Sequence, residues 1–327
     1  MPTRKSPRKG SLQFWPRKRA AKFLPSVNWK AINSEKPLKG FIAYKAGMVS
    51  VAVKDNTEHS MTKGKQKVIP ATILECPQMK IFSVRFYKNG KVFGEVLAEN
   101  LEKELKRKIK LPKENKKKLE SFKDNFDDLK IIVYSLVRKT GLKKKPDMIE
   151  IGLSGDFEEK LNYVKENLGK EISILDVFEQ NSLVDVRGLT KGKGFQGPVK
   201  RFGIKLKKAK SEKGRRRPGS IGPWHPARVT FRVPMAGQLG MFTRAIYNNK
   251  IIDLGKSEDK FKGIKNYGDI KTDYIMVQGS IQGSAKRQLV LTQALRPTKK
   301  QNKKNYELIE LRWKQNYTQS MEKKEKK

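Results

Sequence analysis

The residues that could carry out chemistry are few, and their spacing does not assemble a catalytic or metal site. His59 and His225 are the only histidines, and Cys76 is the only cysteine. A zinc site takes several Cys, His or carboxylate ligands, and no such set surrounds either histidine. Ser220 lies near His225, but no acid is close and no Gly-x-Ser-x-Gly turn holds the serine. The sequence therefore predicts no enzyme, no bound metal and no cofactor.

Three glycines, Gly192-x-Gly194-x-x-Gly197, match the spacing of a dinucleotide-binding loop. Glu212 follows at about the distance of the acid that binds the ribose, roughly twenty residues on. Such a loop needs a helix directly after the glycines, whose N-terminus holds the pyrophosphate. Pro198 and a lysine-rich run follow instead, so we expect no such helix and rank a nucleotide-dependent enzyme low. Glycines among lysines let the backbone approach phosphate groups closely.

These glycines lie inside a strongly basic stretch that runs from Arg187 to Arg217. It contains thirteen lysines and arginines and one acid, Glu212. Leucine and isoleucine are too sparse here to form a core, so we place the stretch on the surface. The whole chain has 74 Lys+Arg and 33 Asp+Glu, a net charge of +41. Because such a charge repels itself, the sequence predicts a polyanionic partner, which means nucleic acid.

Other partners for this charge are less well supported. No apolar run approaches the roughly 20 residues of a membrane-spanning helix. The basic stretches also lack the regular apolar face of a helix that lies on a membrane, so we expect no membrane contact. A free protein that binds duplex DNA remains an alternative. The single cysteine fits a reducing compartment, and no apolar segment of a signal peptide follows the basic N-terminus.

The first part of the chain, residues 1–40, is a basic arm in this interpretation. Residues 1–39 hold eleven cations against one acid, and prolines interrupt any helix. Aromatic residues are interleaved with the cations: Phe14, Trp15, Phe23 and Trp29. A disordered tail seldom contains so many rings, so we expect an extended arm that becomes ordered on RNA, with rings stacked on bases or sugars.

Runs of β-branched and aromatic residues, bounded by turn residues, predict the strands. They cover residues 41–45, 48–54, 66–76, 80–87, 183–187, 228–233, 250–254, 274–278 and 288–293. Asn89-Gly90 separates two apolar runs and predicts a hairpin. Strands that recur at such short intervals favour a barrel or a sandwich. If strands from both ends of the chain pair, that sheet is discontinuous in sequence.

An α+β insertion is predicted between the two groups of strands. Residues 95–171 contain sixteen acids and nineteen cations, so we expect this nearly balanced part to face solvent. Apolar residues at helical spacing predict a helix within 97–109, and Asp156-x-x-Glu159 resembles a capping box before a second helix. Residues 130–137 predict a buried strand.

The C-terminal residues from 298 to 327 form a second basic extension. Leu308, Leu311 and Trp313 are spaced as in a short helix, and the lysines beyond them are expected to fray.

Several segments resemble one known family. They are VDVRGLTKGKGFQGPVKRFGI at 184–204, RPGSIGPWHPARV at 217–229, MAGQLG at 235–240, FIAYKAGMVSVAV at 41–53, VIPATILEC at 68–76 and DYIMVQGSIQGSAKRQLVLTQALRP at 273–297. In this order they resemble protein three of the large ribosomal subunit. The variant resembles the archaeal type, because bacterial members lack the arm and carry amides at Trp224-His225. Eukaryotic members commonly have His where Glu212 stands.

The resemblance implies a mostly β fold with an α+β insertion. It implies a six-stranded translation-protein barrel, like domain two of elongation factors, with an extended basic N-terminal arm and a long internal finger loop. The implied division is an arm at 1–40, a barrel at 41–95 and 172–204 with 245–297, an insertion at 96–171, a finger at 205–244 and a tail at 298–327.

The function implied by the resemblance is structural. Family members bind large-subunit (23S) rRNA near its 3′ end, nucleate subunit assembly and support the region around the peptidyl-transferase centre, without catalysis of their own. The implied location is the ribosome in the cytoplasm, in one copy rather than as a homo-oligomer. Expected neighbours are protein fourteen (uL14) of the large subunit and the L24e-type protein.

We expect rRNA contacts from the cations of the arm and the finger and from the aromatic tip GSIGPWHP. Within a free chain, the alternative for Trp224 is that it folds back onto a small core. The candidate rRNA-binding residues are Arg17, Lys18, Arg19, Lys191, Lys193, Lys200, Arg201, Lys207, Lys208, Lys210, Lys213, Arg215, Arg216, Arg217, Trp224, His225, Arg228, Arg232 and Arg244.

Overall fold

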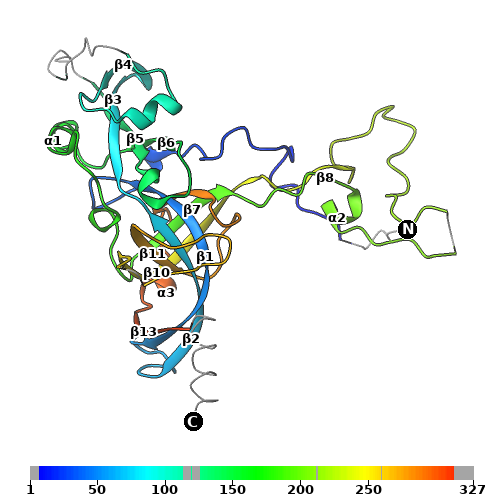
Figure 1. The fold of residues 1–327 in the computed structure, drawn as a ribbon. Helices are drawn as coiled ribbons and strands as arrows, with labels where there is room; N and C mark the ends of the chain where they lie inside the picture. Colours follow the sequence, from blue (N-terminus) through cyan, green and yellow to red (C-terminus); the bar gives the residue numbers. More distant parts are fainter. Residues whose placement is uncertain (1–6, 113–118, 120–125, 211–212, 259, 313–327) are drawn as a thin grey trace. The chain divides into compact units, whose positions relative to one another are not determined.

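The structure is a computed structural model that describes residues 7–112, 119, 126–210, 213–258 and 260–312 (Figure 1). It is mostly β, with few and short helices. The strands are β1 Gly40–Asp55, β2 Gln66–Cys76, β3 Met79–Lys88, β4 Lys91–Leu97, β5 Asp128–Ser135, β6 Met148–Gly152, β7 Leu183–Leu189, β8 Phe195–Gln196, β9 Gly237–Gln238, β10 Thr243–Lys256, β11 Asp273–Gln278, β12 Gln288–Gln293 and β13 Tyr306–Arg312. The α-helices are α1 Phe157–Asn167, α2 Pro198–Phe202 and α3 Lys299–Asn302.

Six strands form a closed sheet. Their order is β12-β7-β10-β11-β2-β1, and β1 pairs with β12 again, so the ring returns to its first strand. Gly40–Tyr44 of β1 pairs with Gln288–Thr292 of β12, and β2 pairs with β11. Strands from both ends of the chain therefore share one sheet, which confirms the predicted discontinuity in sequence.

The segment around Leu308 is a strand, not the predicted helix. β13 pairs with the second half of β1 and shifts register by one residue at Ala52/Val53. Leu308 lies opposite Val53 and Leu311 lies opposite Val51, so the bulge brings both leucines to the same face. A bulge thus produced the three-residue spacing that imitates a helix. Trp313 lies outside the described residues.

A second sheet of four strands has the order β4-β3-β5-β6. The predicted hairpin is confirmed, because Asn89 and Gly90 between β3 and β4 both have φ in the left-handed region, at 51° and 72°. Helix α1 starts with the predicted capping box of Asp156 and Glu159. Its Val164 packs in the same core as Ile131 of β5.

The predicted helix within 97–109 is mostly absent. Leu97 still belongs to β4 and pairs with Ser83. Only Lys103–Arg107 is helical, as the 3-10 helix η2. Leu105 of this helix packs with Phe82 and Tyr134 on the sheet face opposite α1, since β5 side chains alternate between the two faces. The leucines of this segment cover that face one at a time from a mostly irregular backbone, and their spacing in the sequence resembles that of a helix.

Residues 228–233 are not the predicted strand, and none of them is in a regular element. They are flanked by Pro226 and Pro234, which have no backbone N–H for a strand partner. Phe231 in this segment is largely exposed.

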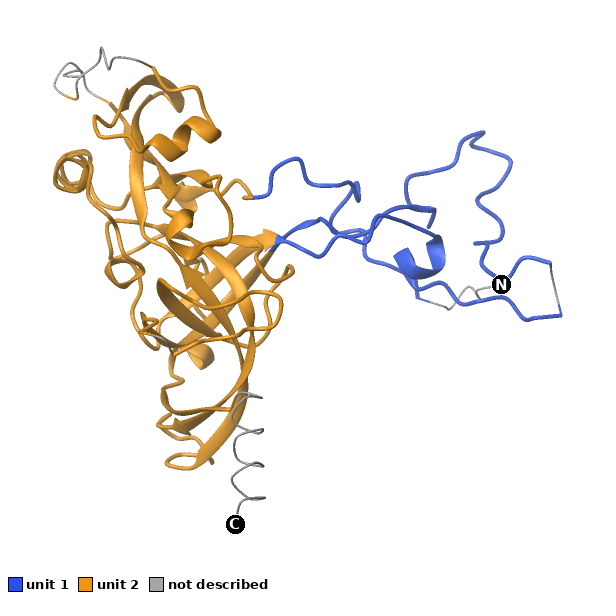
Figure 2. Cartoon of the chain, viewed as in Figure 1, with its two compact units in different colours: residues 1–23, 189–244 blue, residues 24–188, 245–327 orange. Residues whose placement is uncertain are grey.

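The chain divides into two compact units, which Figure 2 colours separately. Unit 1 comprises residues 1–23 and 189–244. Unit 2 comprises residues 24–188 and 245–327 and contains both the closed sheet and the four-stranded sheet. Each unit is described by itself.

Trp29 lies in the core of unit 2, where it is 5% exposed. Its prediction as a ring that stacks on RNA is therefore wrong. Two glycines make room for the indole: a Cβ on Gly152 would lie 2.5 Å from the Trp29 Cβ, and a Cβ on Gly40 would lie 2.8 Å from its Cη2.

We predict that Gly152→Ala destabilises unit 2 by about 1–3 kcal/mol, because the added methyl overlaps the base of the Trp29 side chain. Chemical denaturation of the full chain measures the change. Gly255→Ala is the matched control, since its Cβ would meet Tyr274 at an ordinary 3.7 Å. Equal stability of the two variants would contradict the packing described.

We predict a component of stability that depends on Asp55. Burial raises the pKa of this carboxyl, but hydrogen bonds from Thr57 and Thr62 outweigh burial and lower the pKa from 3.8 to about 2. A lowered pKa in the folded state stabilises above the ordinary value, and this contribution is lost as the pH falls through about 2. The stability difference between the native chain and Asp55→Asn should therefore shrink from pH 5 to pH 2. Glu58→Gln in the same loop is the control.

Candidate nucleic-acid interface

Unit 1 holds just over half of the net positive charge of the chain. Its residues, 1–23 and 189–244, contain 23 lysines and arginines and one acid, Glu212, so its net charge is 23 − 1 = +22 of the total +41. Glu212 lies outside the described residues, and the described part of unit 1 contains no carboxylate side chain. Its cations therefore have no acid within the described unit to pair with.

The segment 190–242, which includes most of the basic stretch and continues beyond it, begins and ends on a two-stranded ribbon. It leaves the closed sheet at the end of β7 and returns at the start of β10, and these two strands are neighbours in that sheet. The Thr190 amide donates to the Phe242 carbonyl at 3.0 Å, and the Lys193 amide donates to the Leu239 carbonyl at 3.0 Å. Strands β8 and β9 continue this pairing. The ribbon fixes both ends of the segment 203–236.

Glycine is required where the two halves of the ribbon approach. Gly240 has φ +76°, and a Cβ there would lie 2.0 Å from the Lys191 carbonyl oxygen. A Cβ on Gly237 would lie 2.9 Å from the Arg201 guanidinium carbon. The glycines of MAGQLG at 235–240 therefore serve tight packing.

Two arginines bind the N-terminal arm to the ribbon. Arg17 donates to the Arg201 carbonyl at 2.8 Å, and Arg201 donates to the Arg17 carbonyl at 3.1 Å. Arg201 also donates to the carbonyls of Gln238 and Met235. Burial lowers the pKa of Arg17, and the charge of Arg201 lowers it further. We call this reciprocal pair the arginine clasp.

An aromatic cluster supports the arginine clasp. The Arg17 guanidinium lies over the Phe202 ring at 4.3 Å and over the Trp15 ring at 5.4 Å. Trp15 stacks against Phe202 at 6.0 Å and meets Phe231 edge-on at 5.8 Å. Unit 1 is thus held by cation–π contacts and backbone hydrogen bonds, with little aliphatic core.

The tip GSIGPWHP at 219–226, which we call the apex, is exposed throughout. Trp224 is 89% exposed, so the alternative in which it folds onto a small core of the free chain is excluded. His225 and Arg228 are exposed beside it. Ser220 donates to the Gly222 carbonyl at 3.3 Å, not to His225, so the geometry does not assemble a nucleophile.

The structure divides the candidate residues into two groups. Arg17, Arg201 and Arg244 are half-buried, with guanidiniums on backbone carbonyls or aromatic rings of unit 1. The remaining candidates are exposed, apart from half-buried Lys207: Lys18, Arg19, Lys191, Lys193, Lys200, Lys208, Lys210, Lys213, Arg215, Arg216, Arg217, Trp224, His225, Arg228 and Arg232.

The structure adds two exposed rings that the candidate set lacked. Phe195 is 77% exposed and Phe231 is 68% exposed, both within unit 1. For Phe195 the signal was present in the sequence, because this phenylalanine stands among glycines and lysines and has few apolar neighbours to bury it.

The glycine triplet requires one correction. We expected no helix after Gly197, yet helix α2 follows directly, with Pro198 in its first turn. Proline is well tolerated in the first helical turn, which the sequence argument overlooked. The dinucleotide site is still unsupported, because α2 has five residues and the glycines lie on the antiparallel β8–β9 ribbon rather than between parallel strands.

Two further findings concern other kinds of site. Within the described ranges, no group of three or more His, Cys, Asp or Glu side chains could hold a metal ion. Among the same residues, no helix is long and apolar enough to cross a membrane. A folded β unit that carries a separate, carboxylate-poor basic unit has the electrostatic character of a protein that binds nucleic acid.

Comparisons with known proteins agree with this class. The family model described as Ribosomal protein L3 matches residues 1–320, so the chain belongs to the ribosomal protein L3 family. The chain is 44% identical to large ribosomal subunit protein uL3 of Methanocaldococcus jannaschii over 308 residues, which cover 89% of this chain and 92% of the relative. The proteins of the same name from Methanobrevibacter smithii and Archaeoglobus fulgidus are 41% and 40% identical, each over 90% of this chain and 93% of the relative.

We predict that Arg17→Lys releases the arm from the ribbon in the free chain, because lysine cannot keep both the stacking and the planar hydrogen bond. The Ala20 amide, which donates to the Met241 carbonyl at 3.0 Å, should then exchange roughly tenfold faster or more. Hydrogen exchange of the full chain measures this.

The matched control is Arg19→Lys, which makes the same change at an exposed position of the arm. Identical exchange at Ala20 in both variants would show that the arginine clasp does not hold the arm.

Proposed function

We propose that this protein binds large-subunit (23S) rRNA directly, near the 3′ end of that molecule, and that it nucleates assembly of the subunit. Family membership makes the chain a structural constituent of the large ribosomal subunit, located in the ribosome in the cytoplasm, and not an enzyme. The further proposal is that the segment 205–244 reaches towards the peptidyl-transferase centre and helps shape the rRNA there.

The observation that carries this proposal is the uncompensated charge of unit 1. Its 23 cations face one acid, so folding within the chain cannot neutralise them. Folded rRNA carries the opposite charge, and its closely packed phosphates repel one another. When unit 1 binds rRNA, condensed counterions are released, so binding should weaken steeply as the salt concentration rises.

The kind of contact follows from the side chains that unit 1 exposes. Lysines and arginines suit phosphate oxygens, and glycines in the ribbon let the backbone come close to them. Exposed rings such as Trp224 suit unpaired bases, which stack on aromatic side chains. These groups recognise the shape of folded RNA with few contacts to base edges.

The same proposal extends to the other parts of the chain. Exposed cations of the arm at 1–40 and of the tail at 298–327 contribute further phosphate contacts, while the core around Trp29 and the closed sheet serve as a rigid support. The proposed protein neighbours are protein fourteen (uL14) of the large subunit and the L24e-type protein, with one copy of this chain per subunit.

We predict that Trp224→Ala leaves the closed sheet folded and allows incorporation into subunits, but slows peptide-bond formation or changes drug sensitivity. One stacked base contributes about 1–3 kcal/mol, so docking of the apex should weaken roughly 5- to 150-fold. Chemical probing of rRNA in purified subunits, together with a peptidyl-transfer assay, measures both effects.

Met61→Ala is the matched control, because Met61 is an equally exposed apolar side chain in unit 2. Normal peptidyl transfer and an unchanged rRNA probing pattern in Trp224→Ala subunits would refute this role of the apex.

A further inference from the structure

A second basic surface lies on unit 2, in the part that the sequence predicted to face solvent. The segment after β4 covers one face of the four-stranded sheet through Leu105, which is fully buried. Its cations Lys106, Arg107 and Lys110 are exposed to solvent. The sequence did not reveal this basic surface, because residues 95–171 contain nearly equal numbers of acids and cations. A count of charges does not show on which face of the fold each side chain lies.

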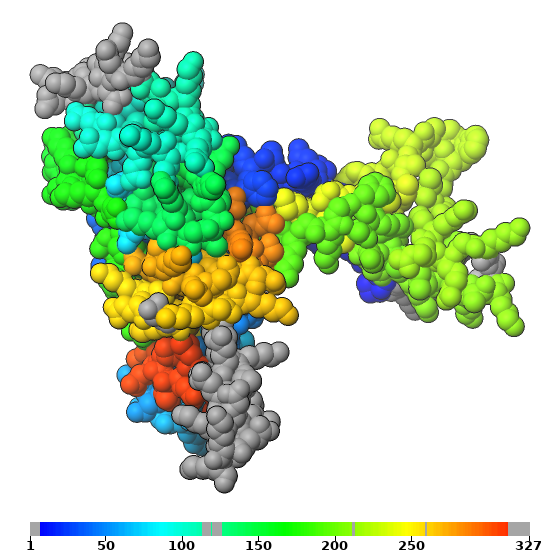
Figure 3. Space-filling view, viewed as in Figure 1, coloured from blue at the N-terminus to red at the C-terminus, as the bar shows by residue number. Residues whose placement is uncertain are grey.

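Lys108 joins this segment to another basic one. Its ammonium donates to the Pro146 carbonyl at 3.1 Å, directly after Lys144 and Lys145. Burial lowers the pKa of Lys108, and although Asp147 opposes this effect, the charges of Lys143 and Lys145 lower it further. This hydrogen bond places the two segments next to each other. In Figure 3 the turquoise and green parts of the chain, to which they belong, lie against each other on the visible face.

Five cations of this surface form no salt bridge with any residue that the structure describes. Among the described residues, the nearby salt bridges connect Arg138 to Glu104, Lys143 to Asp147, and Lys80 to Glu102. They leave out five exposed side chains, which we call the second basic surface: Lys106, Arg107, Lys110, Lys144 and Lys145.

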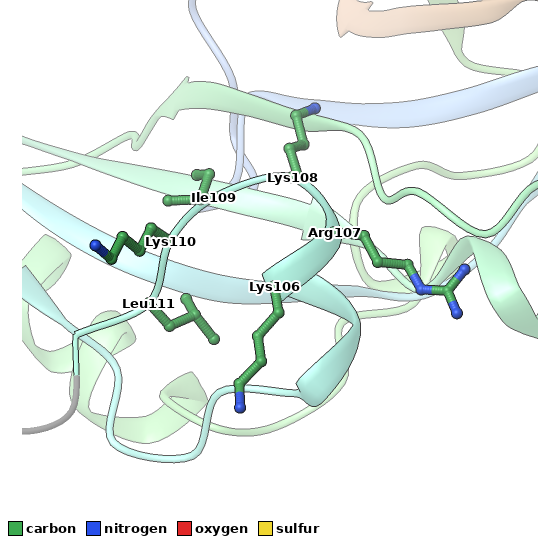
Figure 4. A pocket seen from close by; sticks show the side chains of 6 residues that line it. All are labelled: Lys106, Arg107, Lys108, Ile109, Lys110 and Leu111. Carbon is green, nitrogen blue, oxygen red and sulfur yellow. The ribbon is translucent and has the colours of Figure 1, made fainter.

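The directions of these side chains decide between ligand classes. A hollow of about 360 Å³ lies at the turn Lys106–Leu111. Figure 4 shows that Lys106, Arg107, Lys108 and Lys110 point away from one another rather than into a common centre. A small anion would need converging donors, whereas an extended polyanion can meet each diverging cation with a different phosphate.

A protein partner fits this surface less well than RNA. The turn exposes a single large apolar side chain, Ile109, at 37%. Stable protein interfaces usually have a buried apolar or aromatic centre and few lysines. A lysine-rich surface without such a centre suits the phosphate backbone of RNA.

We propose that the second basic surface binds the phosphate backbone of large-subunit rRNA independently of unit 1. This rests on the proposed function and extends it, because the α+β part then contacts rRNA instead of facing solvent. The protein would hold rRNA at two separate surfaces, one on each unit.

Directed cleavage from single cysteines tests this proposal. Cys76 is fully buried, and burial raises the pKa of its thiol well above the ordinary value, so an introduced surface cysteine is the reactive one. Full-length Lys144→Cys carries an iron–EDTA tether into large subunits, and hydroxyl radicals then cleave nearby rRNA. We expect specific rRNA cleavage from position 144.

Two matched positions make the result decisive. Lys165→Cys lies exposed on α1, which packs on the opposite face of the same sheet, and should give no specific cleavage. Trp224→Cys reports on unit 1. Cleavage from 224 without cleavage from 144 overturns the second surface alone, and absence of cleavage from both overturns the proposed function as well. Cross-linking of position 144 to a neighbouring protein instead of rRNA would also overturn the proposal for the second basic surface.

A second readout measures the charge itself. The binding of the full chain to large-subunit rRNA is measured at several salt concentrations. Replacing the five cations with glutamine should make the negative slope of log affinity against log salt shallower, by about 0.7–0.9 for each phosphate that the surface no longer neutralises. An unchanged slope would show that these cations stay solvated.

Discussion

The lack of internal counter-charge in unit 1 is the constraint on which the rest of the structure depends. Unit 1 has 23 cations and one acid, so its own side chains cannot neutralise its charge. It also has few aliphatic residues to bury, whereas unit 2 is stabilised by a large aliphatic core. Unit 1 is held by backbone hydrogen bonds, by arginine–aromatic stacking and by glycines at close approaches. Each of these devices leaves lysine side chains exposed. Self-repulsion remains, and an external polyanion removes it.

Unit 2 holds the two ends of the basic segment 190–242 in place. The stretch leaves and returns through β7 and β10, neighbouring strands of a closed sheet. Because β7 and β10 pair in that sheet, the basic segment between them is a loop with paired ends. The entropic cost of closing such a loop grows only slowly with its length.

The sequence predicted the parts in which local pattern and fold agree. Most strands of the closed sheet, the Asn89-Gly90 hairpin and the capping box at Asp156 follow from short-range chemistry. The predicted strands 41–45 and 48–54 are one continuous strand, β1, whose pairing with β2 shifts register between Lys45 and Gly47. Predictions failed where tertiary packing produced a misleading period, as at Leu308 and Leu311, where a bulge places both leucines on one face. The burial of Trp29 depends on Gly40 and Gly152, which are distant in sequence. The arginine clasp could not be foreseen either, because it joins residues 184 positions apart.

Sedimentation of a cell lysate tests the central claim most directly. The chain is followed through sucrose gradients at low and at high salt. If rRNA supplies the counter-charge of unit 1, the chain should migrate with large subunits at low salt. It should also stay on them through a high-salt wash: salt weakens each phosphate contact, but the many contacts of an assembled subunit must all break together before the chain is released. Migration at the top of the gradient in low salt would mean that the charge serves another partner, and would contradict this account.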